Sequence, residues 1–85
     1  MPDKLNSTSL AVLLAESTAH HMFEEFRSGR GQGKNFSWAK FPGMVGRIAA
    51  ASFPLHSATE VSPEDLELCR THAEQFATAL SRGMV

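Results

Sequence analysis

Residues 61–83 read VSPEDLELCRTHAEQFATALSRG, and both ends of this stretch carry residues that begin and end helices. The hydroxyl of Ser62 is suited to accept a hydrogen bond from a free amide of the first turn. Pro63 would occupy the first helical position, where its missing N–H is harmless. Gly83 is suited to the left-handed conformation that closes many helices. The sequence therefore predicts a helix over residues 63–82.

One face of this helix is apolar. Side chains spaced three and four residues apart fall on the same face of a helix. That spacing joins the following residues into one stripe: Leu66, Cys69, Ala73, Phe76 and Leu80. Cys69 is the single cysteine, so the chain forms no internal disulfide, and its place in the stripe predicts a small buried side chain. The stripe needs another element to cover it.

A second long helix is predicted over residues 7–27. Its apolar positions repeat the same spacing in Val12, Ala15, Ala19, Met22 and Phe26, and they are widened by Leu10, Leu13, Leu14 and Phe23. Apolar residues on more than one side predict a contact beyond the intramolecular core. We expect this helix to lie antiparallel to the helix at residues 63–82.

A glycine-rich loop and a shorter helix are predicted between the two long ones. Residues 28–35, SGRGQGKN, are too polar and too rich in glycine for a helix or a buried strand. Pro42 is tolerated only near a helix start, and Phe53 precedes Pro54, which disfavours helical geometry. The middle helix is therefore predicted over residues 42–52, after a flexible loop at residues 28–35.

The two sides of the middle helix differ in size. Val45 and Ile48 form a large apolar edge, whereas Gly43, Gly46 and Ala50 gather on the other side. Glycines weaken an isolated helix by about 1 kcal/mol each relative to alanine. Their presence predicts that another backbone approaches closely, either within the bundle or from a partner.

The length bounds the fold. At 85 residues the chain makes one domain, residues 1–85, whose core hides only about 60–65% of the unfolded surface. We expect an all-α, three-helix domain with the glycine-rich loop between its first two helices and with Trp38 and Phe41 closing one end. Its apolar surface exceeds what three short helices hide, which predicts a homodimer, a protein partner, or both.

Neither a secretory signal nor a membrane-spanning segment is apparent. The apolar run from Leu10 to Ala15 is short and is interrupted by Glu16. We therefore expect a cytoplasmic protein without membrane contact.

Positive charge is concentrated in the middle of the chain, although the net charge is −1. No acidic residue lies between Arg27 and Arg47, a segment that also holds Arg30, Lys34 and Lys40. Phe36, Trp38 and Phe41 interleave with these cations, as in surfaces that bind single-stranded nucleic acid. A nucleic-acid-binding accessory protein that uses residues 27–47 is therefore the alternative function, disfavoured by the slightly acidic chain.

No arrangement of residues predicts catalysis or cofactor binding. The serines lack a nucleophile-elbow motif, and no serine or cysteine has an identifiable base. The run HHMFEE places His20, His21, Glu24 and Glu25 at helical spacing, and His72 could add a third ligand to either pair. Metal-binding helix motifs are absent, so we expect no metal site, no cofactor and no enzymatic activity.

The function expected from these patterns is that of a small regulatory or adaptor protein. Such a protein would bind another protein through an apolar helical face, for example as an antagonist of a transcription regulator. The candidate contacts are Leu13, Leu14, Met22, Phe23, Met44 and Ile48, with Arg30, Lys34 and Arg47 for electrostatic steering.

Overall fold

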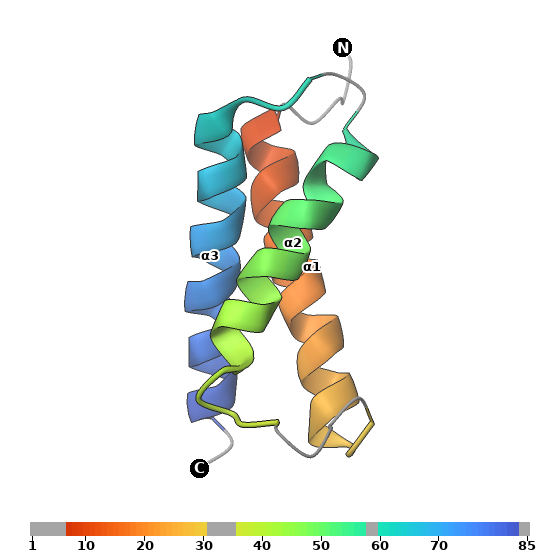
Figure 1. The fold of residues 1–85 in the computed structure, drawn as a ribbon, viewed down its shortest axis with the longest axis vertical. Helices are drawn as coiled ribbons and strands as arrows, with labels where there is room; N and C mark the ends of the chain where they lie inside the picture. The colour runs from red at the N-terminus through yellow and green to blue at the C-terminus, as the bar shows by residue number, and fades with distance from the viewer. Residues whose placement is uncertain (1–6, 31–35, 58–59, 84–85) are drawn as a thin grey trace.

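Three helices make up the fold (Figure 1). The structure is a computed structural model, and it describes residues 7–30, 36–57 and 60–83. Helix α1 spans Ser7–Arg27, α2 spans Phe41–His56 and α3 spans Pro63–Arg82. The described residues contain no strand, so the predicted all-α, three-helix architecture is confirmed. None of these helices is long and apolar enough to cross a membrane.

Helices α1 and α3 run parallel, and α2 runs antiparallel to both (Figure 1). The hydroxyl of Thr8, near the start of α1, donates a 3.2 Å hydrogen bond to Asp65 Oδ1 at the start of α3. Further along both helices, Glu16 Oε2 lies 2.9 Å from His72 Nε2. The predicted antiparallel pairing of the two long helices is therefore wrong. The middle helix was predicted, but the antiparallel pairing did not take into account that this helix, about 24 Å long, returns the chain to its starting end.

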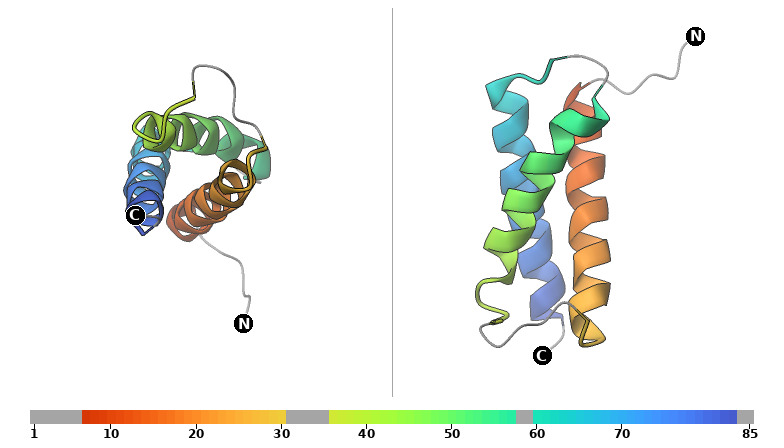
Figure 2. Two further views of the ribbon diagram at one scale, coloured as in Figure 1. Left: turned by 90° about the horizontal axis from the view of Figure 1, so that it is seen from below. Right: turned by 45° about the vertical axis from the view of Figure 1, so that its right-hand side comes forward.

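The core is built largely from small side chains. Its buried members are Ala11, Ala15, Ala19, Met22 and Phe26 of α1, Phe41, Val45, Ala49 and Phe53 of α2, and Cys69, Ala73 and Ala77 of α3. Seen along the bundle in the left panel of Figure 2, the three tilted helices lie along the sides of a triangle, and α2 crosses from α3 to α1. Larger residues of the predicted stripes, such as Leu66 and Leu80, pack half-buried at the edge of this core.

The ends of α3 confirm one predicted cap and correct the other. Ser62 Oγ accepts a 3.1 Å hydrogen bond from the amide of Asp65, as expected for an N-cap. Gly83 has φ −68° and ψ −13°, so the predicted left-handed closure is wrong. Its amide instead continues the helical pattern by donating to the carbonyls of Ala79 and Leu80. Among the glycines that the structure describes, Gly29, just after α1, has the left-handed conformation, with φ 95°.

Helix α2 extends beyond its predicted end. The prediction of residues 42–52 is wrong because the helix continues through Pro54 to His56. Phe53 is fully buried in the core, and burying such a side chain contributes about 1.5–3 kcal/mol. That gain offsets the crowding before a proline and the loss of one helical hydrogen bond to the Ala50 carbonyl.

The predicted loop at residues 28–35 lies only partly within the described residues. Residues 28–30 form a turn after α1, in which the Gly29 amide donates a 3.1 Å hydrogen bond to the Phe26 carbonyl. Residues 31–35, which include Lys34, lie outside the described part of the chain.

Candidate protein-interaction surface

Helix α2 carries a second apolar face in addition to its core face. Met44, Ile48, Ala51 and Leu55 follow each other at spacings of four, three and four residues, which places them on one side of the helix. Ile48 is 45% exposed and Leu55 is 83% exposed, while Ala51 is exposed and Met44 half-buried. We call these four residues the α2 stripe.

The position of α2 in the bundle explains why this stripe is uncovered. The core face of α2 consists of Phe41, Val45, Ala49 and Phe53, which all point between the other two helices. In the left panel of Figure 2, α2 forms one side of the triangle, and its outer side faces no other described helix. Ile48, Ala51 and Leu55 therefore stay in contact with solvent, whereas Met44 also packs against the edge of the core.

Leu55 was not among the residues predicted for this surface. It lay outside the predicted middle helix, which was expected to end at residue 52. The spacing from Ile48 through Ala51 to Leu55 was visible in the sequence, but it has meaning only if the helix passes Pro54. Leu55 therefore belongs to this apolar face only because α2 extends beyond residue 52.

Two cations border the α2 stripe on one flank. Lys40 lies four residues before Met44, and Arg47 lies four residues before Ala51, so each neighbours a member of the stripe. Both side chains are exposed. No acidic residue occurs anywhere between residues 41 and 56. This edge of α2 is therefore positively charged.

The charge distribution along α2 opposes its helix dipole at the N-terminus. Lys40 is the N-cap residue, its side chain makes no capping hydrogen bond, and the first turn contains no acid. A cation near a helix N-terminus is unfavourable, whereas an anion there is stabilising. In α3 the arrangement is the favourable one, with Glu64 and Asp65 in the first turn and Arg82 in the last.

The arginines at the end of α1 and in the turn after it are neutralised within the chain. Arg27 Nη2 lies 2.7 Å from Glu24 Oε1, and Arg30 Nε lies 2.9 Å from Glu25 Oε1. The hydrogen bonds from these arginines lower the pKa of Glu24 and of Glu25 below the ordinary glutamate value. Arg30, predicted to steer a partner, is thus already paired.

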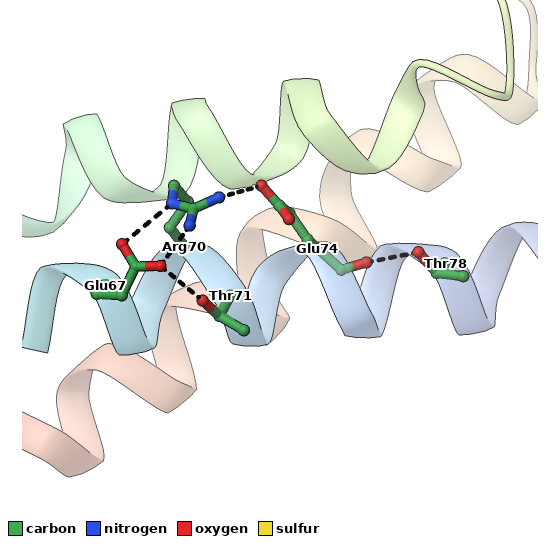
Figure 3. A network of polar contacts seen from close by, with 5 residues as sticks. All are labelled: Glu67, Arg70, Thr71, Glu74 and Thr78. Carbon is green, nitrogen blue, oxygen red and sulfur yellow. Dashed lines mark hydrogen bonds and ion pairs between the residues drawn. The ribbon is translucent and has the colours of Figure 1, made fainter.

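Arg70 is held in the same way on α3. Its guanidinium contacts both Glu67 and Glu74, with 2.6 Å between Arg70 Nη1 and Glu74 Oε2 (Figure 3). The hydrogen bond from Arg70 lowers the pKa of Glu67. Thr71 Oγ1 also donates to Glu67, at 3.2 Å. Within the described residues, Lys40 and Arg47 have no comparable ion pair.

One of the two glycines of α2, Gly46, lets this helix pack closely against α3. A Cβ on Gly46 would lie 3.1 Å from the Arg70 carbonyl oxygen and 2.6 Å from Glu74 Cγ, so α2 approaches α3 closely here. A Cβ on Gly43 would meet only Arg47 Nη1, at 3.8 Å. Of the two explanations left open by the sequence, internal packing holds for Gly46.

The contacts predicted on α1 are divided by the fold. Met22 is buried in the core, so its prediction as a partner contact is wrong for this structure. Leu14 and Phe23 are half-buried against the core. Leu13 is 51% exposed, but its neighbours one turn onward are the polar residues Glu16 and Ser17. It adds a single apolar side chain to the surface of α1.

Five aromatic rings close the end of the bundle where α1 ends and α2 begins. Trp38 packs on Phe41 with ring centroids 5.0 Å apart and on Phe36 at 5.1 Å. Phe26 contacts Phe36 at 4.8 Å and Phe41 at 5.6 Å, and Phe23 contacts Trp38 at 5.9 Å. Phe41 is fully buried. These rings pack edge-to-face or tilted on each other, so part of the ring surface on which a base could stack is covered.

The histidines and acids considered for a metal site are separated. Glu24 and Glu25 face arginines, and His72 pairs with Glu16 of α1. The His20 ring lies 6.5 Å from the Phe76 ring. Among residues 7–30, 36–57 and 60–83, no three His, Cys, Asp or Glu side chains come together in a way that could hold a metal ion.

The single thiol is shielded by the core. Cys69 is fully buried, and burial raises the pKa of its thiol above the ordinary value. A protonated, inaccessible thiol is a poor nucleophile. The structure therefore places Cys69 where the sequence predicted it, as a small core side chain.

No protein-family model, no curated protein and no solved structure matches this chain.

Proposed function

We propose that this chain is a small, non-enzymatic regulatory or adaptor protein that binds another protein through the α2 stripe. The observation that supports this most is the exposure of Ile48 and Leu55 on one face of a helix that already has a complete core face. Covering a large aliphatic side chain fully contributes about 1.5–3 kcal/mol. Apolar anchors at helical spacing are the usual means by which a helix docks on a partner.

The class of regulator is inferred by analogy. An antagonist that masks a transcription regulator works by covering part of that regulator with a small folded surface, and it needs no catalytic group. A three-helix domain with one apolar outer stripe suits this task. Lys40 and Arg47 would orient the approach of a partner, because rim charges act mainly on the rate of association.

A comparison of three variants tests the proposal. Ile48→Asp and Leu55→Asp place a charge within the α2 stripe, and Leu13→Asp places the same charge at an exposed apolar site on α1. All three should retain helical circular dichroism, because exposed substitutions change stability by about 0.5 kcal/mol or less. In affinity capture from the native host, followed by mass measurement, only the two stripe variants should lose the complex. If both keep every partner, the proposal fails.

A homodimer through the same stripe is the competing arrangement. One stripe has room for one occupant, so sedimentation of the purified chain over a concentration series separates the two. A species of 9.3 kDa at every concentration agrees with a stripe that awaits another protein. A dimer that Ile48→Asp dissociates would assign the stripe to a second copy instead.

A further inference from the structure

We propose that the partner segment on the α2 stripe is an amphipathic helix that carries acidic side chains along one flank. This inference rests on the proposed function and adds the chemistry of the partner to it. It derives from the charges that border the stripe and from the sizes of the stripe residues.

The cations of α2 set a spacing that a partner helix can match. Lys40 and Arg47 are seven residues apart, which is two helical turns or about 10.5 Å along the axis. Both neighbour the stripe on the same flank. A partner helix lying along the stripe, with Asp or Glu seven residues apart on the facing flank, would place one carboxylate near each cation.

Among residues 7–30, 36–57 and 60–83, no acidic side chain is paired with Lys40 or Arg47 on this flank. Arg27, Arg30 and Arg70 are each paired with a glutamate close to them in the sequence, whereas α2 contains no acid. The N-terminus of α2 adds its partial positive charge beside Lys40. A partner carboxylate near Lys40 would therefore meet two favourable contributions, the ammonium and the helix dipole, and a second carboxylate would meet the guanidinium of Arg47.

The sizes of the stripe residues favour a helix with large apolar anchors. Ala51 is small and lies between Ile48 and Leu55, one turn from each. A Leu or Phe of the partner can approach α2 closely at Ala51 while the two larger side chains flank it. This knob-and-hole fit orders the partner along the stripe, and the charged flank selects its orientation and sequence.

Synthetic peptides test the inference directly. The probes are helical peptides of about 18 residues, or five turns, that share one leucine stripe and differ at flank positions seven residues apart, which hold Glu, Gln or Lys. Fluorescence anisotropy with the full chain should rank the affinities as Glu above Gln above Lys. The Glu and Lys peptides should differ by about tenfold or more at low salt, and added salt should reduce the difference.

Charge-reversal variants assign the preference to α2. Arg47→Glu leaves Lys40 as the one cation of the flank beside a new carboxylate, so the Glu and Lys peptides should bind with nearly equal affinity, and the double variant Lys40→Glu, Arg47→Glu should invert the order. Arg82→Glu reverses an exposed cation at the end of α3 and is the matched control, which should leave the order unchanged. Ile48→Asp should abolish binding of all the peptides.

The possible outcomes separate this inference from the proposed function. If the three peptides bind equally and Ile48→Asp still abolishes binding, the stripe is a docking site but the acidic flank is wrong. A preference that survives Arg47→Glu, or that Arg82→Glu abolishes equally, also overturns the inference. So does a chain that binds none of the peptides. A dimer that persists in saturating Glu peptide and dissociates on Ile48→Asp would give the stripe to a second copy.

Discussion

Two glycines of α2, only one helical turn apart, have different surroundings. A Cβ at position 46 would crowd the Arg70 carbonyl at 3.1 Å, and that atom belongs to the backbone of α3, which cannot turn away as a side chain can. The same atom at position 43 would meet only ordinary contacts. The sequence shows two equivalent glycines, and only the position of α3 distinguishes them.

Alanine at each position is expected to act in opposite directions. Gly43→Ala should raise the free energy of unfolding by up to about 1 kcal/mol, because alanine favours the helix and restricts the unfolded chain. Gly46→Ala gains the same propensity but must push α2 away from α3, and overpacking of this kind costs about 1–3 kcal/mol. Urea unfolding monitored by circular dichroism measures both. Equal stabilities of the two variants would contradict the close approach at Gly46.

At the scale of the helix, α2 shows which boundaries the sequence determines. The bounds of α1 and α3 follow from local patterns, such as the Ser62–Pro63 start, and the structure has them as predicted. The end of α2 does not, because local preference at Phe53 and Pro54 opposes the helix. Burial of Phe53 between the other two helices overrides that preference, and such burial is visible only after assembly.

Pro54 should therefore be a weak point of α2 that can be repaired. Pro54→Ala restores an amide that can donate to the Ala50 carbonyl, and one such hydrogen bond contributes about 0.5–1.5 kcal/mol. We expect a higher urea midpoint and slightly greater helical circular dichroism. Phe53→Ala is the contrasting variant, which should lose about 3–5 kcal/mol as a core truncation. A Pro54→Ala protein less stable than the parent would show that the proline shapes the end of α2 favourably.

At the scale of the molecule, the sequence indicated which helices exist but not how they are arranged. The apolar stripes identified the helices that pack together, yet stripes carry no direction, and the parallel arrangement of α1 and α3 comes from the length of α2. The candidate surface was likewise found in part. Met44, Ile48 and Arg47 were predicted, whereas Leu55 depended on the end of α2 and Met22 proved to be a core residue. Apolar residues that face the core and apolar residues that face outward lie next to each other on these helices. Only the packed bundle shows which of them are buried.

The ion pairs on α1 and α3 predict how stability of the whole bundle responds to acid. Hydrogen bonds from arginines lower the pKa of Glu24, Glu25 and Glu67 from the ordinary value of 4.5. The folded protein thus holds these carboxylates charged at pH values where the unfolded chain begins to protonate. Their contribution to stability is present above about pH 4.5 and is lost as the pH falls through the lowered pKa values.

The urea midpoint should accordingly be nearly constant from neutral pH to about pH 5 and should fall below about pH 4.5. Glu67→Gln removes one of the contributing carboxylates, so its midpoint should fall less steeply in that range, although it begins lower because Arg70 loses a partner. Glu60→Gln is the control, since Glu60 is exposed, lies outside the helices and has no ion pair within the described residues. Its profile should follow that of the parent. If Glu67→Gln and Glu60→Gln gave the same acid profile, the Glu67–Arg70 pair would contribute nothing to the pH dependence, and acid sensitivity would have to come from the net charge of the bundle.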